Sequence, residues 1–287
     1  MPRLDVTAAD LAARARAFRA LHRAEAVFLM PNAWNAGSAR LLEAGGFAAL
    51  ATTSAGIAYS LGRSDGSGAV SRSEMMDNIR RITHAVSVPV NADLEAGYGP
   101  TAADVAETIR LAIDAGAAGG NIEDATGDAA APLFDAGTAA ERIAAARAAA
   151  DASGLDFTLT ARSDAFLCGH PDAFDEAVQR CRLYAQAGAD CLFVPGVRDS
   201  GVLAALVREV AAPMNVVMGL TGASLSVQEL GAMGVRRISI GGSLARATFG
   251  LVRRAADEMR ERGTFSFAEQ QIPDAQLGRF FAEYDDE

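Results

Sequence analysis

Three apolar stretches of this sequence end in charged residues, and these charged residues are its strongest chemical signal. The stretches read VNADLEAGYG at 90–99, AGGNIED at 118–124 and FTLTARSD at 157–164. Each is typical of a short buried strand. In a parallel β/α protein the carboxyl ends of the strands meet on one face, where active sites lie. The side chains that we expect on this face are Asp93, Glu95, Glu123, Asp124, Arg162 and Asp164.

Several carboxylates in one pocket indicate a bound cation, because like charges raise one another's pKa and a divalent cation removes that conflict. Asp93 and Glu95 would point the same way on a continuing strand, and Glu123 follows the next strand. Mg²⁺ keeps several waters and takes one or two protein carboxylates, so the sequence predicts a magnesium site, with Mn²⁺ as the alternative ion. The competing interpretation is that these acids only cap the following helices. Asp124 is a weaker candidate, which could lie behind the metal ligands or form an ion pair.

An anionic substrate is indicated by Arg162, which ends the fifth predicted strand. Its guanidinium can bind a carboxylate through two parallel hydrogen bonds, or it can pair with Asp164 or Glu123. Both roles stay open at this point. The absence of lysine is also informative, since all 26 basic residues are arginine. Schiff-base chemistry on a carbonyl substrate is therefore excluded.

Weaker signals come from polar residues in loops and strands. Residues 52–56 read TTSAG after the second predicted strand, where hydroxyl and backbone N–H groups could hold a carboxylate or an oxyanion. Asp65 could add to the metal site or simply stabilise a turn. Asn215 is a polar residue inside an apolar strand, and the competing interpretation is a hydrogen-bonded amide in a barrel interior.

The elements that must position these residues alternate eight times between β-rich and helical patterns. Strands are predicted at 27–31, 47–53, 88–93, 118–123, 157–162, 190–195, 213–218 and 235–240. Helices are predicted at 35–44, 72–86, 101–116, 138–152, 172–188, 198–211, 224–232 and 243–262. The alternation predicts an α/β fold, a (β/α)8 TIM-type barrel. An open doubly wound sheet is disfavoured, because Pro31–Trp34 stands where a G-x-G-x-x-G turn would follow the first strand.

We expect one barrel domain over 1–287, with the barrel itself at about 27–262. A helix near 7–22 precedes it. The tail 263–287 is expected to be helical, and because it carries apolar residues such as Phe280, Phe281 and Tyr284, we expect it to dock on a second subunit. The net charge of -10 argues against a nucleic-acid partner. Three cysteines without CxxC spacing, no signal peptide and no membrane span favour a cytoplasmic protein.

The motifs VNADLEAGYG, NIED, TLTARSD and ISIGGSLARA, in this order, resemble the isocitrate lyase / phosphoenolpyruvate mutase superfamily. The resemblance runs from about residue 27 to 262. It implies a (β/α)8 barrel that binds Mg²⁺ and a small 2-oxo acid. It also implies chemistry on C–C or P–C bonds next to an enolpyruvate-like intermediate. Members often exchange the eighth helix between subunits, so a homo-oligomer, either a dimer or a tetramer, is expected.

The same resemblance assigns roles to individual residues. It implies that Asp93 touches the metal directly and that Glu95, Glu123 and Asp65 hold its waters. Arg162 resembles the arginine that binds the substrate carboxylate. The resemblance further implies that the oxo acid is held at Thr53, Ser54 and Ala55. Asn215 is predicted separately, as a polar strand residue, to bind the substrate, and the predicted catalytic residues are Arg162, Thr53 and Ser54.

The sequence departs from the family in the loop after the fourth strand. The lyases carry a Lys-Lys/Arg-Cys-Gly-His motif there and the mutases a Lys and an Asn, whereas this loop reads ATGDAAAPLFDAG at 125–137. The Cys-Gly-His at 168–170 follows the fifth strand instead. The remaining groups are enough for a Mg²⁺-dependent lyase of the oxaloacetate decarboxylase kind. The alternatives are P–C bond chemistry of the phosphonopyruvate type and a 2-oxo acid binding protein with reduced catalysis.

Overall fold

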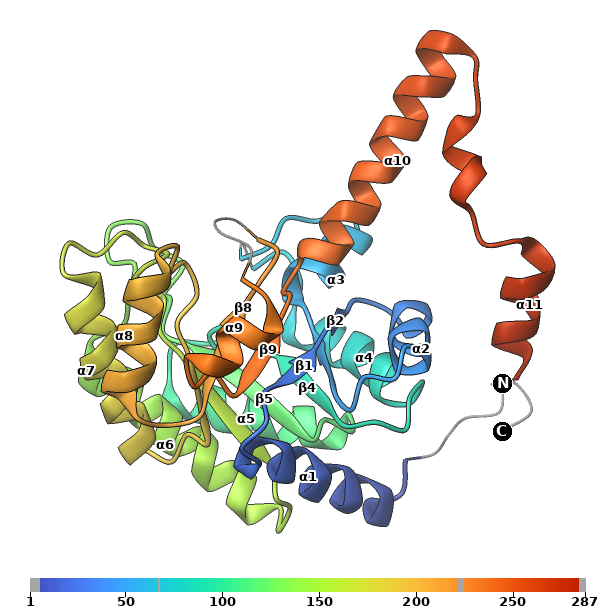
Figure 1. The fold of residues 1–287 in the computed structure, drawn as a ribbon. Helices are drawn as coiled ribbons and strands as arrows, with labels where there is room; N and C mark the ends of the chain where they lie inside the picture. Colours follow the sequence, from blue (N-terminus) through green and yellow to red (C-terminus); the bar gives the residue numbers. More distant parts are fainter. Residues whose placement is uncertain (1–5, 67, 221–224, 284–287) are drawn as a thin grey trace.

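A closed barrel of parallel strands forms the centre of the computed structural model, which describes residues 6–66, 68–220 and 225–283 (Figure 1). The first barrel strand is split in two: β1 pairs with β9 and β2 pairs with β3, which closes the sheet. The nine strand segments thus make eight barrel strands. They are β1 (Phe28–Met30), β2 (Asn32–Ala33), β3 (Leu50–Thr52), β4 (Val90–Asp93), β5 (Gly119–Glu123), β6 (Thr158–Arg162), β7 (Cys191–Phe193), β8 (Met214–Val217) and β9 (Arg237–Ser239).

Helices alternate with these strands, and the predicted TIM-type barrel is confirmed. Those between or after the strands are α2 (Ala36–Ala44), α3 (Ser54–Ser60), α4 (Arg72–Thr83), α5 (Ala102–Asp114), α6 (Ala136–Ala152), α7 (Ala173–Gln186), α8 (Ser200–Val210), α9 (Val227–Ala232) and α10 (Ser243–Arg262). The predicted extra segments are α1 (Ala8–Arg23) before the barrel, and η1 (Ser266–Gln270) and α11 (Asp274–Ala282) in the tail. Residue 224 of one predicted helix and Tyr284 of the tail lie outside the described residues.

Capping residues explain where several helices begin. Thr101 accepts a hydrogen bond from the backbone N–H of Asp104, and the Asp104 carboxylate accepts one from the Thr101 N–H in return. The same reciprocal arrangement starts α1, α2, α4 and α9. Each such capping box satisfies two backbone donors that the first helical turn leaves unpaired. The helix starts are therefore encoded locally, and they fix where each strand-to-helix loop ends.

Side chains alternate along the strands and divide the barrel into two environments. The outward-facing Leu159 and Leu192 are fully buried between the sheet and the helices. The inward-facing residues Asn91, Asn121 and Asn215 are also buried, but they are polar. A barrel interior lined by amides must satisfy them with neighbouring side chains or with a ligand, because an unpaired buried polar group is costly. This polar interior is what leaves room for a functional site.

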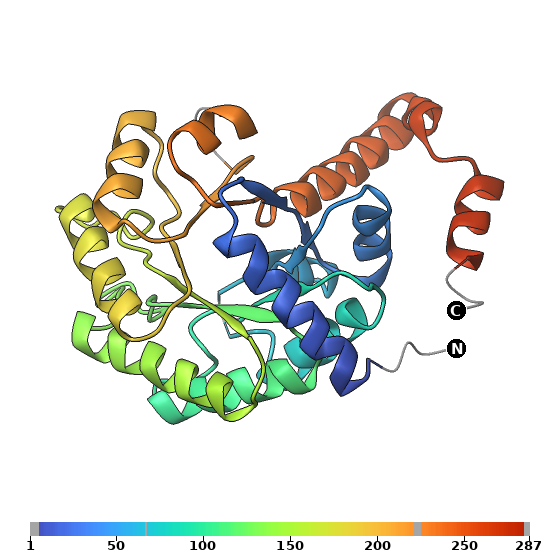
Figure 2. The same cartoon turned by 60° about the horizontal axis from the view of Figure 1, so that its bottom comes forward.

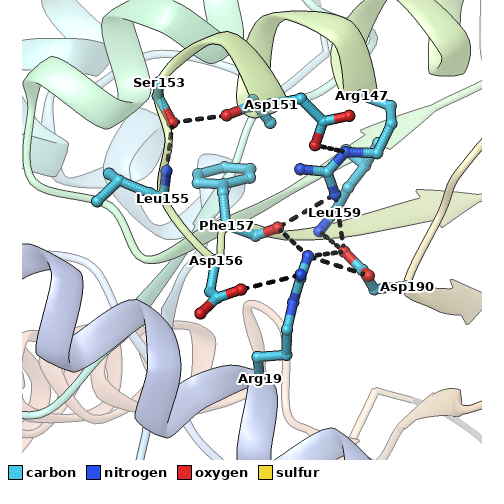
Figure 3. A network of polar contacts seen from close by, with 10 residues as sticks. Arg19, Arg147, Asp151, Ser153, Leu155, Asp156, Phe157, Leu159 and Asp190 are labelled. Carbon is cyan, nitrogen blue, oxygen red and sulfur yellow. Dashed lines mark hydrogen bonds and ion pairs between the residues drawn. The ribbon is translucent and has the colours of Figure 1, made fainter.

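An ionic network ties α1 to the amino-terminal ends of the strands (Figure 3). The Asp190 carboxylate accepts hydrogen bonds from the Arg147 guanidinium at 3.0 Å, the Arg19 guanidinium at 3.2 Å and the Leu159 backbone N–H at 2.9 Å. Arg19 also donates to Asp156 at 3.2 Å. The network lies beneath the barrel, at the end opposite the carboxyl ends of the strands, so its role is to hold α1 against the sheet.

Helix α10 does not lie against the barrel along its length but points away from it, and η1 and α11 follow it (Figures 1 and 2). Phe249, Val252 and Met259 on α10 are exposed, as are Phe265 and Ile272 in the tail. Leaving so many large apolar side chains in water is unfavourable, so this extension has the character of a docking surface. Among the described residues, no helix has the length and apolar composition needed to cross a membrane.

Candidate functional site

A cavity of about 430 Å³ opens at the carboxyl ends of the strands. It is lined by residues from all eight barrel strands and from several of the loops that follow them. Most of the residues predicted to form the site line it: Thr53, Ser54, Ala55, Asp65, Asp93, Arg162 and Asn215. Glu95 and Glu123 do not line it.

Asp93, at the end of β4, is held in place by three hydrogen bonds. Its Oδ2 accepts one from the Ser54 backbone N–H at 2.8 Å, and its Oδ1 accepts one from the Asn121 side-chain amide at 3.0 Å. Its own N–H donates to the Thr52 hydroxyl at 2.8 Å. Each carboxylate oxygen keeps a second lone pair. The carboxylate is therefore fixed in direction while remaining able to contact a cation.

The TTSAG segment is not a loop, as its composition suggested, but the start of helix α3. Thr53 is the residue before the first helical turn, and its hydroxyl accepts a hydrogen bond from the Gly56 N–H. A short helix was missed because Ser, Thr and Gly are favoured in turns and have weak helix propensity. Gly56 permits the helix here, since a Cβ at this position would lie 2.6 Å from Thr53 and 2.9 Å from Trp34. Thr53, Ser54 and Ala55 of this turn all line the cavity.

Glu95 lies in a tight turn rather than on a continued strand. The expectation that Asp93 and Glu95 point the same way assumed a continued strand, and this assumption is wrong. Strand β4 ends at Asp93, and Glu95 adopts a left-handed conformation with φ of 49°. Non-glycine residues seldom adopt it. The turn is held by Arg142 of α6, which is buried and donates to the carbonyls of Ala96, Gly99 and Pro100. The Glu95 carboxylate accepts a hydrogen bond from the Tyr98 hydroxyl at 3.1 Å.

Arg162 takes both of the ion-pair partners that the sequence offered. Its guanidinium lies 2.8 Å from the Glu123 carboxylate, and it binds Asp164 through two hydrogen bonds of 2.5 and 2.9 Å. It also lines the cavity. Burial would lower the pKa of Arg162, but Glu123 and Asp164 raise it, so the group stays charged. Burial raises the pKa of Glu123 despite the nearby guanidinium. The substrate-binding role of Arg162 stays a prediction. Its two ion pairs do not conflict with that role, because Arg162 lines the cavity as well.

Asp124 belongs to a buried cluster behind this arginine, which was one of its two expected roles. Its carboxylate accepts hydrogen bonds from the Tyr184 hydroxyl at 2.6 Å, the Arg180 guanidinium at 3.1 Å and the Asp164 backbone N–H at 2.8 Å. Because Asp164 in turn binds Arg162, the cluster fixes the orientation of the cavity arginine.

The donor set fits a hard divalent cation. Burial, together with the negative charges of Asp93 and Asp65, raises the pKa of Glu95 to about 7. Glu123 also feels the charges of Asp93 and Glu95. Within the described residues, no three His, Cys, Asp or Glu side chains are grouped as direct metal ligands. This arrangement suits Mg²⁺, which takes one or two carboxylates directly and reaches others through its waters. Asp93 would hold such an ion, with Glu95, Glu123 and Asp65 around it.

Magnesium binding is expected to release protons at neutral pH. The pKa of Glu95 is near 7 in the free protein, so about half of this carboxyl is protonated there, and a nearby cation favours the charged form. Affinity for Mg²⁺ should therefore rise with pH between about 6 and 8, by up to about tenfold per unit for each proton displaced. Titration calorimetry in two buffers of different ionisation enthalpy measures the protons released. A Glu95→Gln protein should release fewer, and an unchanged number would contradict the assignment.

Several cavity residues were not singled out from the sequence. Asn121 orients Asp93, and Asn32 accepts hydrogen bonds from the Ile240 and Gly241 N–H groups at 3.0 and 2.8 Å. Arg237, Ser239 and Asn91 also line the cavity. A signal existed, because Asn91 and Asn121 each precede by two residues an acid already predicted to face the site.

The loop after β5 contains no group for proton transfer of the kind found in the lyase and mutase motifs. It forms a small hairpin in which Ala125 pairs with Leu133. Cys168 is not among the cavity-lining residues, and its thiol donates to the Ala165 carbonyl at 3.4 Å. Cys168 thus does not replace the absent lyase cysteine within this arrangement.

A parallel β/α barrel that gathers carboxylates, an arginine and a helix N-terminus around one cavity has the architecture of barrel enzymes that act on small anionic substrates. The chain belongs to the phosphoenolpyruvate phosphomutase family, whose model matches residues 18–260. The suspected membership of the isocitrate lyase / phosphoenolpyruvate mutase superfamily is thereby confirmed. This superfamily contains lyases and mutases of small acids.

Three relatives illustrate the range of activities. A crystal structure from Burkholderia cenocepacia J2315, provisionally described as a lyase/mutase, is 50% identical with a TM-score of 0.92 and covers 96% of this chain and 98% of that one. The 2-methylisocitrate lyase of Escherichia coli K12 is 34% identical over 189 residues, which are 64% of this chain and 62% of the relative. A phosphonopyruvate hydrolase complex with oxalate and Mg²⁺ is 25% identical, with a TM-score of 0.84 and coverage of 95% and 96%.

Proposed function

We propose that this protein is a Mg²⁺-dependent lyase that cleaves a C–C bond of a small 2-oxo acid, with decarboxylation of the oxaloacetate kind as its reaction. The observation that carries the proposal is the single cavity lined by Asp93, by the first turn of α3 and by Arg162. The phosphonopyruvate hydrolase neighbour, bound to oxalate and Mg²⁺, supports the metal and the ligand class.

Each side chain has a role in this reaction. Asp93 would hold the cation, which when bound polarises the 2-oxo group and stabilises negative charge that develops on it. The Ala55 N–H at the start of α3 and the Thr53 and Ser54 groups would hold the oxo acid, because a helix N-terminus favours an anion. Arg162 would bind the substrate's 1-carboxylate, and Asn215 would contact the ligand deeper in the cavity.

Decarboxylation is favoured because it needs no proton donor at the bond that breaks. The electron pair of the C3–C4 bond moves into the 2-oxo group, CO₂ leaves, and the enolate later takes a proton from water. An aldol-type cleavage would instead need a base and an acid in place. The loop 125–137 lacks the Lys, Cys and His of the related lyases, and its two carboxylates, Asp128 and Asp135, accept hydrogen bonds from the backbone N–H groups of Ala130 and of the first turn of α6. The residues present therefore match the least demanding of the family's reactions.

The deciding experiment compares three substrates under Mg²⁺: oxaloacetate, 2-methylisocitrate and phosphonopyruvate. Pyruvate formation from oxaloacetate is followed with a coupled assay, and the protein-free rate with Mg²⁺ is subtracted because oxaloacetate decays unaided. Enzymatic loss of CO₂ that disappears on chelation supports the proposal. Turnover of phosphonopyruvate alone would favour P–C chemistry, and tight pyruvate binding without turnover would favour a binding protein.

We further propose that α10 and the tail 263–287 dock on a second copy of the chain, giving a dimer or tetramer. Support comes from the exposed Phe249, Val252 and Met259 on a helix that points away from its own barrel (Figure 1). A Phe249→Asp/Val252→Asp protein should dissociate to smaller species in sedimentation velocity while keeping its helical circular dichroism. An exposed polar double variant, Asp257→Ala/Glu261→Ala, is the control. A monomeric unaltered protein at micromolar concentration would refute the proposal.

A further inference from the structure

The inner end of the cavity contains a buried cation whose charge no carboxylate of the described residues neutralises. Arg237 on β9 is only 1% exposed, yet it lines the cavity. Its Nε donates to the Asn215 side-chain oxygen at 2.9 Å, its Nη2 to the Thr160 hydroxyl at 3.0 Å, and its Nη1 lies 3.0 Å from His22 Nε2. All three partners are side chains that carry no negative charge.

The neighbours of Arg237 remain neutral at physiological pH. His22 of α1 has its pKa lowered to about 3 by burial and by the charge of Arg237. Its Nδ1 lies 2.9 Å from the Phe18 carbonyl, so Nδ1 carries the proton and Nε2 accepts from Arg237. Burial raises the pKa of the nearby Cys191 thiol, which keeps it uncharged. A buried charge without a counter-charge is costly, so the natural partner of this guanidinium is the anionic group of a ligand.

Hydrogen-bonding capacity points the same way. The guanidinium has five N–H donors, and the three described contacts use three of them. Asn91, which also lines the cavity and is 2% exposed, has a side-chain oxygen with no partner among the described residues. Native interiors rarely leave such groups unpaired. The two remaining donors of Arg237 suit a negatively charged ligand group, whereas the Asn91 oxygen, which is an acceptor, needs a donor such as a water molecule beside that group.

The depth of Arg237 sets the length of that ligand. Thr160, which binds its guanidinium, precedes Arg162 by two residues on the same inward face of β6. One such step is about 7 Å along a strand, towards the end of the barrel that α1 closes. Pyruvate and oxalate held at Asp93 and Arg162 are too short to reach the inner guanidinium. A 2-oxo acid with a carboxylate at the far end of a five-carbon chain has the required reach.

We propose that Arg237 binds a second carboxylate of the substrate, one that the product keeps. This inference rests on the proposed function and narrows its substrate class. An arginine that paired with the departing carboxylate would stabilise the charge that must vanish as CO₂ forms, and so would oppose the reaction. The carboxylate at Arg237 is therefore the distal one, and the departing β-carboxyl group lies nearer the mouth. The substrate is a 3-carboxylated 2-oxo dicarboxylate, and the product is a 2-oxo dicarboxylate of about five carbons.

A matched pair of ligands tests this on the unaltered protein. Titration calorimetry with Mg²⁺ should show 2-oxoglutarate binding at least about tenfold more tightly than 2-oxopentanoate, which has the same chain length without the distal charge. Equal affinities would overturn the inference, including the case in which a small inorganic anion already fills the inner site. Pyruvate binding that depends on Mg²⁺ and Asp93 separately tests the proposed function, so the two failures are distinguishable.

Variants then assign the preference to Arg237. In Arg237→Gln the ratio between the two ligands should fall towards one while pyruvate affinity stays within about twofold. Thr160→Val removes one hydrogen bond but keeps the charge, and it should retain most of the ratio. An Arg237→Gln protein that loses affinity for all three ligands alike, with an unchanged melting temperature, would overturn the proposal. If Arg237→Gln fails to fold, Arg237→Lys, which keeps the charge, replaces it and should retain a preference above threefold.

Discussion

Replacing Asp93 by alanine is expected to abolish Mg²⁺-dependent binding of 2-oxo acids and to lower kcat/KM by at least about a thousandfold, which corresponds to about 4 kcal/mol of lost transition-state stabilisation. Asp93 is the carboxylate that lines the cavity while its direction is fixed by Ser54 and Asn121. Removing it leaves Glu95 and Glu123 without the central ligand of the proposed ion. Calorimetry with Mg²⁺ and pyruvate measures the binding, and the coupled oxaloacetate assay measures turnover.

Two further variants separate charge from structure. Asp93→Asn keeps the size of the side chain but places an amide N–H₂ against a donor, either the Ser54 N–H or the Asn121 amide, so it should lose Mg²⁺ affinity almost as fully. Asp77→Asn on the exposed face of α4 removes the same charge outside the cavity, where Asp77 pairs with Arg80, and should leave binding and turnover unchanged. An Asp93→Ala protein that binds Mg²⁺ with wild-type affinity would contradict the assignment of Asp93 as the metal ligand.

The parallel barrel could be predicted from sequence because its signals are local and repeated. Apolar runs such as 157–162 alternate with capped amphipathic helices, and each capping box is visible as a residue pair three apart. The strand ends at Asp93, Glu123 and Arg162 followed from the same alternation. These elements needed no knowledge of tertiary contacts, since in a parallel barrel every strand ends on the same face.

What could not be predicted depends on contacts between distant segments. The start of α3 is held where the Ser54 N–H donates to Asp93 and where Gly56 lies close to Trp34, two residues from other parts of the chain. Glu95 left the strand direction because Arg142, 47 positions further on, holds its turn. Arg237 is one of two adjacent arginines, and only the closed barrel shows that it points inward to Thr160 and His22. The alternation of side chains along each strand predicts which residues face the barrel interior. It cannot predict which of these inward-facing charged residues lack an oppositely charged partner.

Loss of the Asp190 carboxylate is expected to destabilise the fold by about 3 kcal/mol. The reason is that two guanidinium groups and one backbone N–H lose their hydrogen-bond acceptor at once. Asp190 is 28% exposed and binds Arg19, Arg147 and the Leu159 N–H together (Figure 3). The partial exposure keeps the loss below that of a fully buried ion pair. In urea unfolding, Asp190→Ala should shift the free energy by this amount, with a fall in melting temperature of about 5 °C.

The neighbouring Asp156 provides the matched control. It contacts the same Arg19 guanidinium at 3.2 Å but is 46% exposed and has no second ion pair among the described residues, so Asp156→Ala should cost about 0.5 kcal/mol. Asp190→Asn, which keeps an acceptor for Leu159, should fall between the two. Since the network lies at the end of the barrel opposite the mouth, Asp190→Ala should bind pyruvate and Mg²⁺ normally below its melting temperature. Equal losses for Asp156→Ala and Asp190→Ala would mean that α1 is held by apolar packing of Phe18 rather than by these charges.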